Sequence, residues 1–340
     1  MYQIEVKKLK KYFNKKIVLK DIDFKVKKGE LMCLLGPSGC GKSTTLKIIS
    51  GLTLEDSGEI YLKGKLSNKI PAEKRGAIIV FQDYALFPHM SVYDNIAFGL
   101  KIKKVNKDIL DKKVKDMIEI LKLKGFENKF PKELSGGQKQ RVSIGRALAV
   151  DPEVLLLDEP FANLDINIKS SIREMILDIQ KKLKVTTILV THDKEDALTM
   201  ADKIALMIDG SIMQYGTPKE LYEKPITKEV ADFFGERNYI KCISKNSEVI
   251  TEIGNLNVEL KRKGEFNIVV NPEDISIGLK EKENSINGQI LKRTYAGEKI
   301  YYIIKCKDKI LKVTDYSKNL YKVSEMVKIN IDFNRISFLN

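Results

Sequence analysis

The stretch Gly36-Pro37-Ser38-Gly39-Cys40-Gly41-Lys42-Ser43-Thr44 directly follows the apolar run Leu31-Met32-Cys33-Leu34-Leu35. The spacing GxxxxGKS is typical of a loop that binds triphosphates, because its glycines let successive backbone N–H groups turn inward around an anion. In such a loop Lys42 reaches the β- and γ-phosphates, and the Ser43 hydroxyl is a ligand of Mg²⁺. Residues 44–50 are predicted to begin a helix whose positive end faces the phosphates. The residues expected to contact nucleotide here are Gly36, Ser38, Gly39, Cys40, Gly41, Lys42, Ser43 and Thr44.

Length and composition indicate a globular chain of two or three domains. With 340 residues, of which 43% are hydrophobic, the chain is long enough to bury a sizeable core. No apolar run approaches the roughly eighteen residues of a membrane span, and residues 1–7 contain no continuous apolar segment of a signal peptide. We therefore expect the protein to stay in the cytoplasm.

The four cysteines and two histidines argue against a disulfide framework and against a zinc cluster. Cys33, Cys40, Cys242 and Cys306 are too widely spaced for a CxxC motif. With only two histidines, any metal is expected to be Mg²⁺ that enters with the nucleotide.

The net charge of +14 is compatible with nucleic acid, with an anionic membrane surface, or with no specific partner. Lysine greatly outnumbers arginine and is spread over the whole sequence. This distribution favours a solvated, lysine-rich surface over a dedicated nucleic-acid patch.

Two acids follow the apolar run Val154-Leu155-Leu156-Leu157. A carboxylate at the carboxyl end of a buried strand beside a phosphate loop is suited to hold Mg²⁺, and the next carboxylate to polarise an attacking water. We assign Asp158 to the metal and Glu159 to the general base. A lone Asp-Glu pair would be read as a solvated turn, but the preceding apolar residues and the nearby loop argue against that interpretation.

Gln82 and His192 also come where predicted buried strands end. The carboxyl edge of one parallel sheet is where α/β folds keep their ligands. Gln82 is expected either to orient a water or bind Mg²⁺ at the nucleotide, or to be an ordinary loop residue. His192 is expected to contact the γ-phosphate. Upstream, Tyr12 either stacks on an adenine ring or packs in the core.

A second anion-binding helix is predicted at Ser135-Gly136-Gly137-Gln138. Ser135 can cap this helix, and the two glycines leave backbone N–H groups uncovered. Because one triphosphate already has its loop, a second such helix suggests that two copies of the chain enclose the nucleotide between them. Before it, apolar residues at helical spacing from Leu110 to Leu121, with Asn106 as cap, predict a small helical insertion.

Together these segments resemble the ATP-binding subunit of ABC transporters, over about residues 2–235. In family order, they are similar to the Walker A, Q-loop, signature, Walker B, D-loop and H-loop motifs. The corresponding segments are Gly36 to Ser43, Gln82, Leu134 to Gln138, Leu155 to Glu159, Asn163 to Asp165, and His192.

The resemblance implies a P-loop α/β ATPase with a mixed sheet and a helical subdomain at about residues 91–150. It implies ATP and Mg²⁺ as cofactors, with Ser43, Gln82 and Asp158 around the metal, and Lys42, Gln82, Glu159 and His192 in catalysis. Tyr12 then corresponds to the aromatic that stacks on adenine. Ser135, Gly136, Gly137, Gln138 and Asp165 would contact nucleotide across a head-to-tail homodimer.

The resemblance also implies membrane permeases as partners, reached through the Q-loop and the aromatic run from Tyr84 to Phe98. The protein would lie at the cytoplasmic face of the membrane, with a solute-binding protein as an indirect partner and no nucleic acid expected. Two departures from the family pattern, Ala162 for a frequent Ser and Gly145 for a common Ala, remove no catalytic group.

After residue 235 the helical periodicity ends, and short alternating strands take over. About one hundred residues of this kind, 236–340, predict a small all-β, OB-like domain. The segment Asn271-Pro272-Glu273-Asp274-Ile275 resembles the regulatory domains of importers of the maltose, polyamine, ferric-iron, sulfate and phosphonate group, with Asn271 where Arg is usual. Stacking aromatics interleaved with basic residues are sparse in this domain, so regulation or dimer support is favoured over nucleic-acid binding.

The sequence therefore predicts an ATP-hydrolysing subunit of an ABC importer of a small solute. The alternatives are a soluble ATPase that acts on nucleic acid or the ribosome, and an exporter subunit. Tandem cassettes or long coiled coils, which the soluble factors carry, are not found here. Polyamine, ferric iron and phosphonate or another anion are favoured over sugar as the solute.

Overall fold

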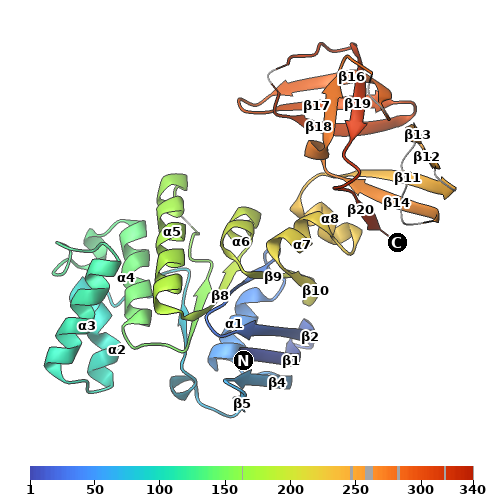
Figure 1. Cartoon of the computed structure of the whole chain (residues 1–340). Coiled ribbons are helices and arrows are strands. Elements are labelled where there is room, and N and C mark those ends of the chain that lie inside the picture. The colour runs from blue at the N-terminus through green and yellow to red at the C-terminus, as the bar shows by residue number, and fades with distance from the viewer. Residues whose placement is uncertain (163, 246–247, 257–262, 282–283, 318, 340) are drawn as a thin grey trace. The chain divides into compact units, whose positions relative to one another are not determined.

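The computed structural model describes residues 1–162, 164–245, 248–256, 263–281, 284–317 and 319–339 (Figure 1). The chain divides into two compact units, Met1–Pro218 and Lys219–Asn340.

The first unit contains a six-stranded sheet in the order β10-β9-β3-β8-β7-β6. Strands β9, β3, β8, β7 and β6 are parallel to their neighbours, whereas β10 is antiparallel to β9. Every residue of β3, β7 and β8 is buried, as expected for strands covered on both faces. The strands are β3 (Leu31–Leu35), β6 (Ala77–Val80), β7 (Val154–Asp158), β8 (Thr186–Thr191), β9 (Lys203–Ile208) and β10 (Ser211–Gly216).

A second, antiparallel sheet has the order β2-β1-β4-β5. In its strands buried and exposed side chains largely alternate, so one face contacts the core. One hydrophobic core joins residues of this sheet, of the six-stranded sheet and of helix α1 (Lys42–Ser50). The strands are β1 (Tyr2–Phe13), β2 (Lys16–Lys27), β4 (Ser57–Leu62) and β5 (Lys65–Leu66).

Three helices of the first unit, α2 (Val92–Ile102), α3 (Lys107–Ile120) and α4 (Gly136–Leu148), lie together at one end of it (Figure 1). Their N-termini are capped by the side chains of Ser91, Asn106 and Ser135. The predicted caps Asn106 and Ser135 are thereby confirmed. The remaining helical elements are α5 (Ile166–Leu183), α6 (Lys194–Met200), η1 (Ala72–Lys74) and η2 (Pro131–Glu133).

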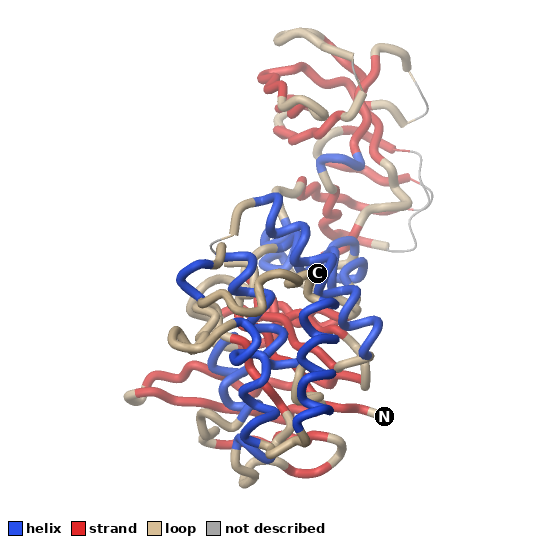
Figure 2. Tube along the Cα trace, turned by 90° about the vertical axis from the view of Figure 1, so that its left-hand side faces the viewer, coloured by secondary structure: helices blue, strands red, loops and turns tan. Residues whose placement is uncertain are grey.

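The second unit contains mainly strands, shown in red in Figure 2. Two five-stranded sheets, β13-β12-β11-β14-β20 and β15-β19-β16-β17-β18, share one hydrophobic core, so the predicted all-β, OB-like character is confirmed. Its helical elements are α7 (Pro218–Glu223), α8 (Lys228–Phe234) and η3 (Pro272–Asp274). Its strands are β11 (Asn238–Lys245), β12 (Glu248–Thr251), β13 (Gly254–Leu256), β14 (Gly264–Val270), β15 (Ile275–Gly278), β16 (Ile286–Tyr295), β17 (Ile300–Cys306), β18 (Lys309–Asp315), β19 (Met326–Ile331) and β20 (Ser337–Leu339).

The two compact units divide after residue 218, earlier in the chain than the predicted end of the ATPase domain at residue 235. Helices α7 and α8 bond to the strand-rich part. From α7, Tyr222 donates to Glu273, and the carbonyl of Glu223 accepts from Ser337. In α8, Asp232 accepts from the hydroxyl of Tyr239 on β11. Within the residues that the structure describes, no helix is long and apolar enough to cross a membrane.

Candidate nucleotide site

The phosphate loop leads from the buried strand β3 into α1, as predicted. A Cβ atom at Gly36 would lie 2.0 Å from the carbonyl oxygen of Met207, so only glycine fits. Gly41, with φ of +104°, is the N-cap of α1 in a left-handed conformation. The loop therefore wraps closely against β9 and presents the helix N-terminus at the sheet edge.

Lys42 is buried within this loop, with 4% of its surface exposed. Its ammonium donates to the carbonyl oxygens of Gly36 at 2.8 Å and Pro37 at 2.7 Å. The charge is thus held at the centre of the loop, where a phosphate group would be bound. The neighbouring Cys40 is also buried, and burial raises the pKa of its thiol, which keeps it protonated and weakly reactive.

Ser43 and Asp158, two of the predicted metal ligands, are in direct contact. The Ser43 hydroxyl donates to Oδ1 of Asp158 at 2.7 Å. Asp158 is buried at the end of β7, and burial raises the pKa of its carboxyl group, against the opposing effect of the hydrogen bond from Ser43. A hydroxyl and a carboxylate side by side are the hard oxygen donors that Mg²⁺ prefers. The residues present therefore fit a magnesium ion.

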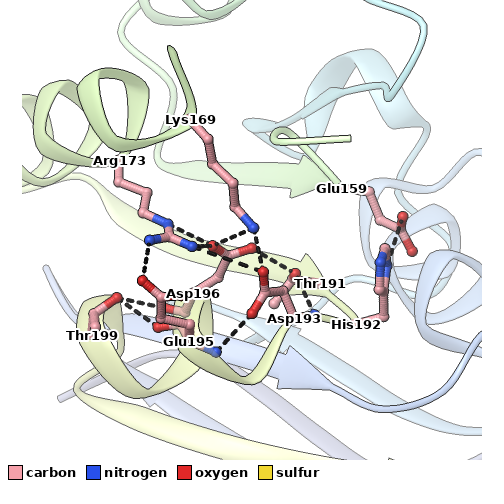
Figure 3. Close-up of polar contacts among 9 residues, drawn as sticks. All are labelled: Glu159, Lys169, Arg173, Thr191, His192, Asp193, Glu195, Asp196 and Thr199. Carbon is pink, nitrogen blue, oxygen red and sulfur yellow. Dashed lines mark hydrogen bonds and ion pairs between the residues drawn. The ribbon is translucent and has the colours of Figure 1, made fainter. Parts of the chain in front are cut away.

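Glu159 and His192 face each other (Figure 3), with 3.2 Å between Oε2 of Glu159 and Nδ1 of His192. Glu159 has a positive φ of 45°, and its N–H donates to the carbonyl of Val190 on the adjacent strand. A non-glycine residue in this conformation is uncommon, and such residues cluster at active sites. His192 is the more exposed of the two, with 56% of its side chain accessible.

The predicted residues gather on one edge of the sheet because their strands are neighbours. Gly36 follows β3, His192 follows β8, Glu159 follows β7 and Gln82 follows β6, and these four strands are adjacent and parallel. The expectation of one carboxyl edge is thereby confirmed. Gln82 itself is exposed in the loop after β6.

A charged cluster between α5 and α6 was not anticipated from the sequence (Figure 3). Asp196 of α6, with 1% of its side chain exposed, accepts from Nε of Arg173 at 2.6 Å and lies 3.1 Å from Nζ of Lys169. Its second oxygen accepts from the hydroxyl of Thr191 at 3.0 Å. Because Thr191 immediately precedes His192, the cluster joins α5 to the strand end that bears the histidine.

The loop after Gln82 is hydrogen-bonded to α4, a connection that the sequence also did not predict. Ser143 donates to the carbonyl of Tyr84 at 2.8 Å, and Arg146 donates to the carbonyl of Ala85 at 2.7 Å. Both carbonyls belong to residues with positive φ. The guanidinium of Arg146 also lies 5.3 Å from the ring centroid of Phe87. The loop and the helix are therefore held together by a group of three contacts.

The second anion-binding helix, α4, begins with a reciprocal cap. Ser135 accepts from the N–H of Gln138, and the Gln138 side chain accepts from the N–H of Ser135 at 2.9 Å. Ser135 is exposed, whereas Gly137 is buried and packs closely on α5, since a Cβ there would lie 2.6 Å from Ile168. Gly136, beside Gly137, forms the first residue of the helix.

Other predicted positions have structural explanations. Asp165 is the N-cap of α5 and accepts from the N–H of Ile168. At Gly145, a Cβ would lie 2.4 Å from Leu121, which accounts for glycine in place of the usual alanine. Tyr12 lies near the end of β1 with its ring half-exposed, on a different sheet from the phosphate loop. Asn163 lies outside the described residues.

Comparisons with known proteins agree with this geometry. A family model described as ABC transporter matches residues 19–162. The chain is 40% identical over 334 residues to the spermidine/putrescine import ATP-binding protein PotA of Acetivibrio thermocellus, covering 97% of this chain and 94% of that protein. It is 43% identical to the protein of that name from Clostridioides difficile (strain 630), with 86% of each chain covered. It is 42% identical to the protein of that name from Clostridium novyi (strain NT), covering 96% of this chain and 95% of that protein.

Solved structures are similar to part of the chain. CbiO1 from Clostridium perfringens, part of the ABC transporter complex CbiONQ, has a TM-score of 0.60 and 33% identity, covering 65% of this chain and 90% of that one. The ATP-binding cassette MJ0796, in a dimeric post-hydrolysis state with ADP and Pi, has a TM-score of 0.57 and 29% identity, covering 63% and 98%.

Proposed function

Since this chain belongs to the ATP-binding subunits of ABC transporters, we propose that it supplies the energy for import of a polyamine, spermidine or putrescine. The observation that carries the proposal is the extent of the similarity. Identity of 40–43% to spermidine/putrescine import proteins covers 86–97% of this chain, so it reaches beyond the shared ATPase motifs into the strand-rich second unit. The sequence motifs alone left ferric iron and phosphonate open as solutes beside a polyamine, and the similarity to these proteins narrows the choice to a polyamine.

The sheet edge supports a specific division of roles in ATP hydrolysis. Lys42, at the centre of the loop, would leave its backbone carbonyl partners to bind the γ-phosphate. Glu159 would accept the proton of the attacking water, and His192, in contact with it, would contact the γ-phosphate. Ser43, Asp158 and Gln82 would hold Mg²⁺, which, when bound, neutralises charge on the phosphates.

The second anion-binding helix supports a head-to-tail homodimer. Ser135 lies exposed at the start of α4, so the helix N-terminus is accessible to the nucleotide of a second copy. In this arrangement each ATP lies between the phosphate loop of one copy and Ser135 of the other. The loop that follows Gln82 would transmit closure to membrane permeases at the cytoplasmic face.

Uptake into proteoliposomes tests the proposal. The chain is reconstituted with its permease subunits and solute-binding protein, with ATP inside the vesicles. We expect ATP-dependent uptake of labelled spermidine or putrescine, and none with a Lys42→Ala chain. ATP-dependent uptake of ferric iron, a phosphonate, sulfate or maltose, with no polyamine uptake, would contradict the assigned solute while leaving the transport ATPase intact.

A further inference from the structure

A cavity of about 570 Å³ lies entirely within the second unit. Its size falls in the range of small-molecule sites, roughly 300 to 1,000 Å³. Its walls come from α7, from residues 235–237 between α8 and β11, from η3 and from strands β16 to β18. Residues that matter for its chemistry are Tyr222, Arg237, Glu273, Lys292, Tyr301 and Lys312.

Arg237 is the most unusual residue of this cavity, because it is a buried charge with neutral partners. Only 8% of its surface is exposed. Its guanidinium donates to the side-chain oxygen of Asn271 and the carbonyl of Ala231, and it lies 4.4 Å from the ring centroid of Tyr222. Within the described part of the chain, no carboxylate forms an ion pair with Arg237, and Nη2, which is closed off from solvent, has no hydrogen-bond partner.

Such an arrangement favours an added counter-charge. A buried charge without an ion pair has lost its hydration and gained no opposite charge in return. An oxyanion in the cavity supplies that counter-charge, and the planar guanidinium is suited to carboxylate and phosphate oxygens.

The charged residues of the cavity wall are Arg237, Lys292 and Lys312 against Glu236 and Glu273, which leaves one net positive charge. The carboxylate of Glu236 is paired with Lys312 at 2.6 Å, and that of Glu273 accepts from the Tyr222 hydroxyl. Lys292 is an exposed residue of the wall, and within the described residues it forms no ion pair. The rings of Tyr222 and Tyr301 add flat, partly apolar surface.

We propose that this cavity binds a small molecule that carries a carboxylate or a phosphate on a flat or apolar body, with Arg237 and Lys292 contacting the oxyanion. The site uses residues of the second unit alone. It therefore does not depend on the solute or on the ATPase mechanism proposed above.

Isothermal titration calorimetry of the full chain tests this site, in chloride-poor buffer with ADP and Mg²⁺ present to fill the phosphate loop. The probes are benzoate and phenyl phosphate, which separate carboxylate from phosphate recognition, with neutral benzamide and cationic spermidine as contrasts. We expect at least one anion to bind and neither contrast probe to do so. Arg237→Gln should weaken that binding at least about tenfold, and Lys292→Gln severalfold. Lys305→Gln, the same change at an exposed lysine of β17 outside the cavity wall, should leave it unchanged.

Circular dichroism establishes that each variant is folded. If Arg237→Gln is not, Arg237→Lys and Lys292→Gln decide the question, with weaker binding expected for both. Failure of both anions to bind, equal affinity in the native chain and in the cavity variants, or preferential binding of spermidine would each overturn the proposal.

Discussion

Asp158 is a residue at which folding and function have opposite requirements. It is buried against Ser43, and burial raises the pKa of its carboxyl group. For an acid whose pKa is raised on folding, the stabilising contribution is present below the unfolded pKa, about 3.9, and is lost as the pH rises through the folded value. At neutral pH the charged carboxylate therefore lowers stability.

Replacing Asp158 with Asn should consequently raise the melting temperature at pH 7 while removing a metal ligand. We expect ATP hydrolysis to fall by about a hundredfold or more. Thermal unfolding from pH 4 to 8 checks the first part, and the advantage of the variant should grow with pH. A variant that melts below the native chain at pH 7 would contradict the argument.

Glu159→Gln removes the expected base and preserves the size of the side chain. Phosphate release should fall by about 10²- to 10⁴-fold, whereas ATP binding is retained and ATP-bound dimers accumulate. Steady-state phosphate release and sedimentation in the presence of ATP measure both effects. Glu119→Gln, the same change on the exposed face of α3, is the matched control and should behave as the native chain. Undiminished turnover in Glu159→Gln would show that another group is the base.

Site residues at strand ends could be predicted from the sequence for a physical reason. A buried run followed by a polar residue marks the carboxyl end of a strand, and parallel neighbours bring such ends together; Asp158, Glu159 and His192 were placed in this way. Asp196 and Arg146 carry no such mark. They occupy ordinary polar positions of helices, and their partners come from other elements, 23 and 61 residues away for Arg173 and Ala85.

At the scale of elements, the contact between α5 and α6 depends on Asp196. Its buried carboxylate forms ion pairs with Arg173 and Lys169 and accepts a hydrogen bond from Thr191. It thereby joins α5 to the strand end before His192. Without these contacts α5 and α6 would not be held together, and the strand end before His192 would lose their support.

Asp196→Asn leaves Arg173 and Lys169 without their buried counter-charge, so we expect a loss of about 3 to 5 kcal/mol in the free energy of unfolding. Glu195→Gln is the control on the same helix. Glu195 binds the same arginine at 2.9 Å but has 70% of its side chain exposed, and its loss should cost about 1 kcal/mol or less. Urea unfolding measures both, and equal effects would contradict the role of burial.

At the scale of the whole molecule, the second unit has a hydrophobic core of its own. Leu221 on α7, with Val230 and Ala231 on α8, is fully buried, although these residues precede the strands. The sequence did not reveal this membership, because a short helix between two domains has the same pattern whichever side it packs against.

A fragment of residues 219–340 should therefore unfold cooperatively, whereas a fragment of residues 236–340, which lacks both helices, should be less stable or unfolded. Burial of each large apolar side chain contributes about 1.5 to 3 kcal/mol, so the difference between the fragments should be several kcal/mol. Calorimetry of the two fragments measures it. Equal melting temperatures would show that α7 and α8 do not stabilise the second unit and that its folding boundary lies at residue 235.

The contacts of Ser143 and Arg146 with the carbonyls of Tyr84 and Ala85 have a consequence for energy transfer. Because the loop and α4 are one bonded piece, a displacement of either carries the other with it. Coupling free energy is reciprocal. If ATP binding shifts this loop and thereby changes its affinity for a permease, binding of the permease to the loop changes the affinity for ATP by the same factor. The membrane partner then acts as an effector of the nucleotide site as much as a receiver of its motion.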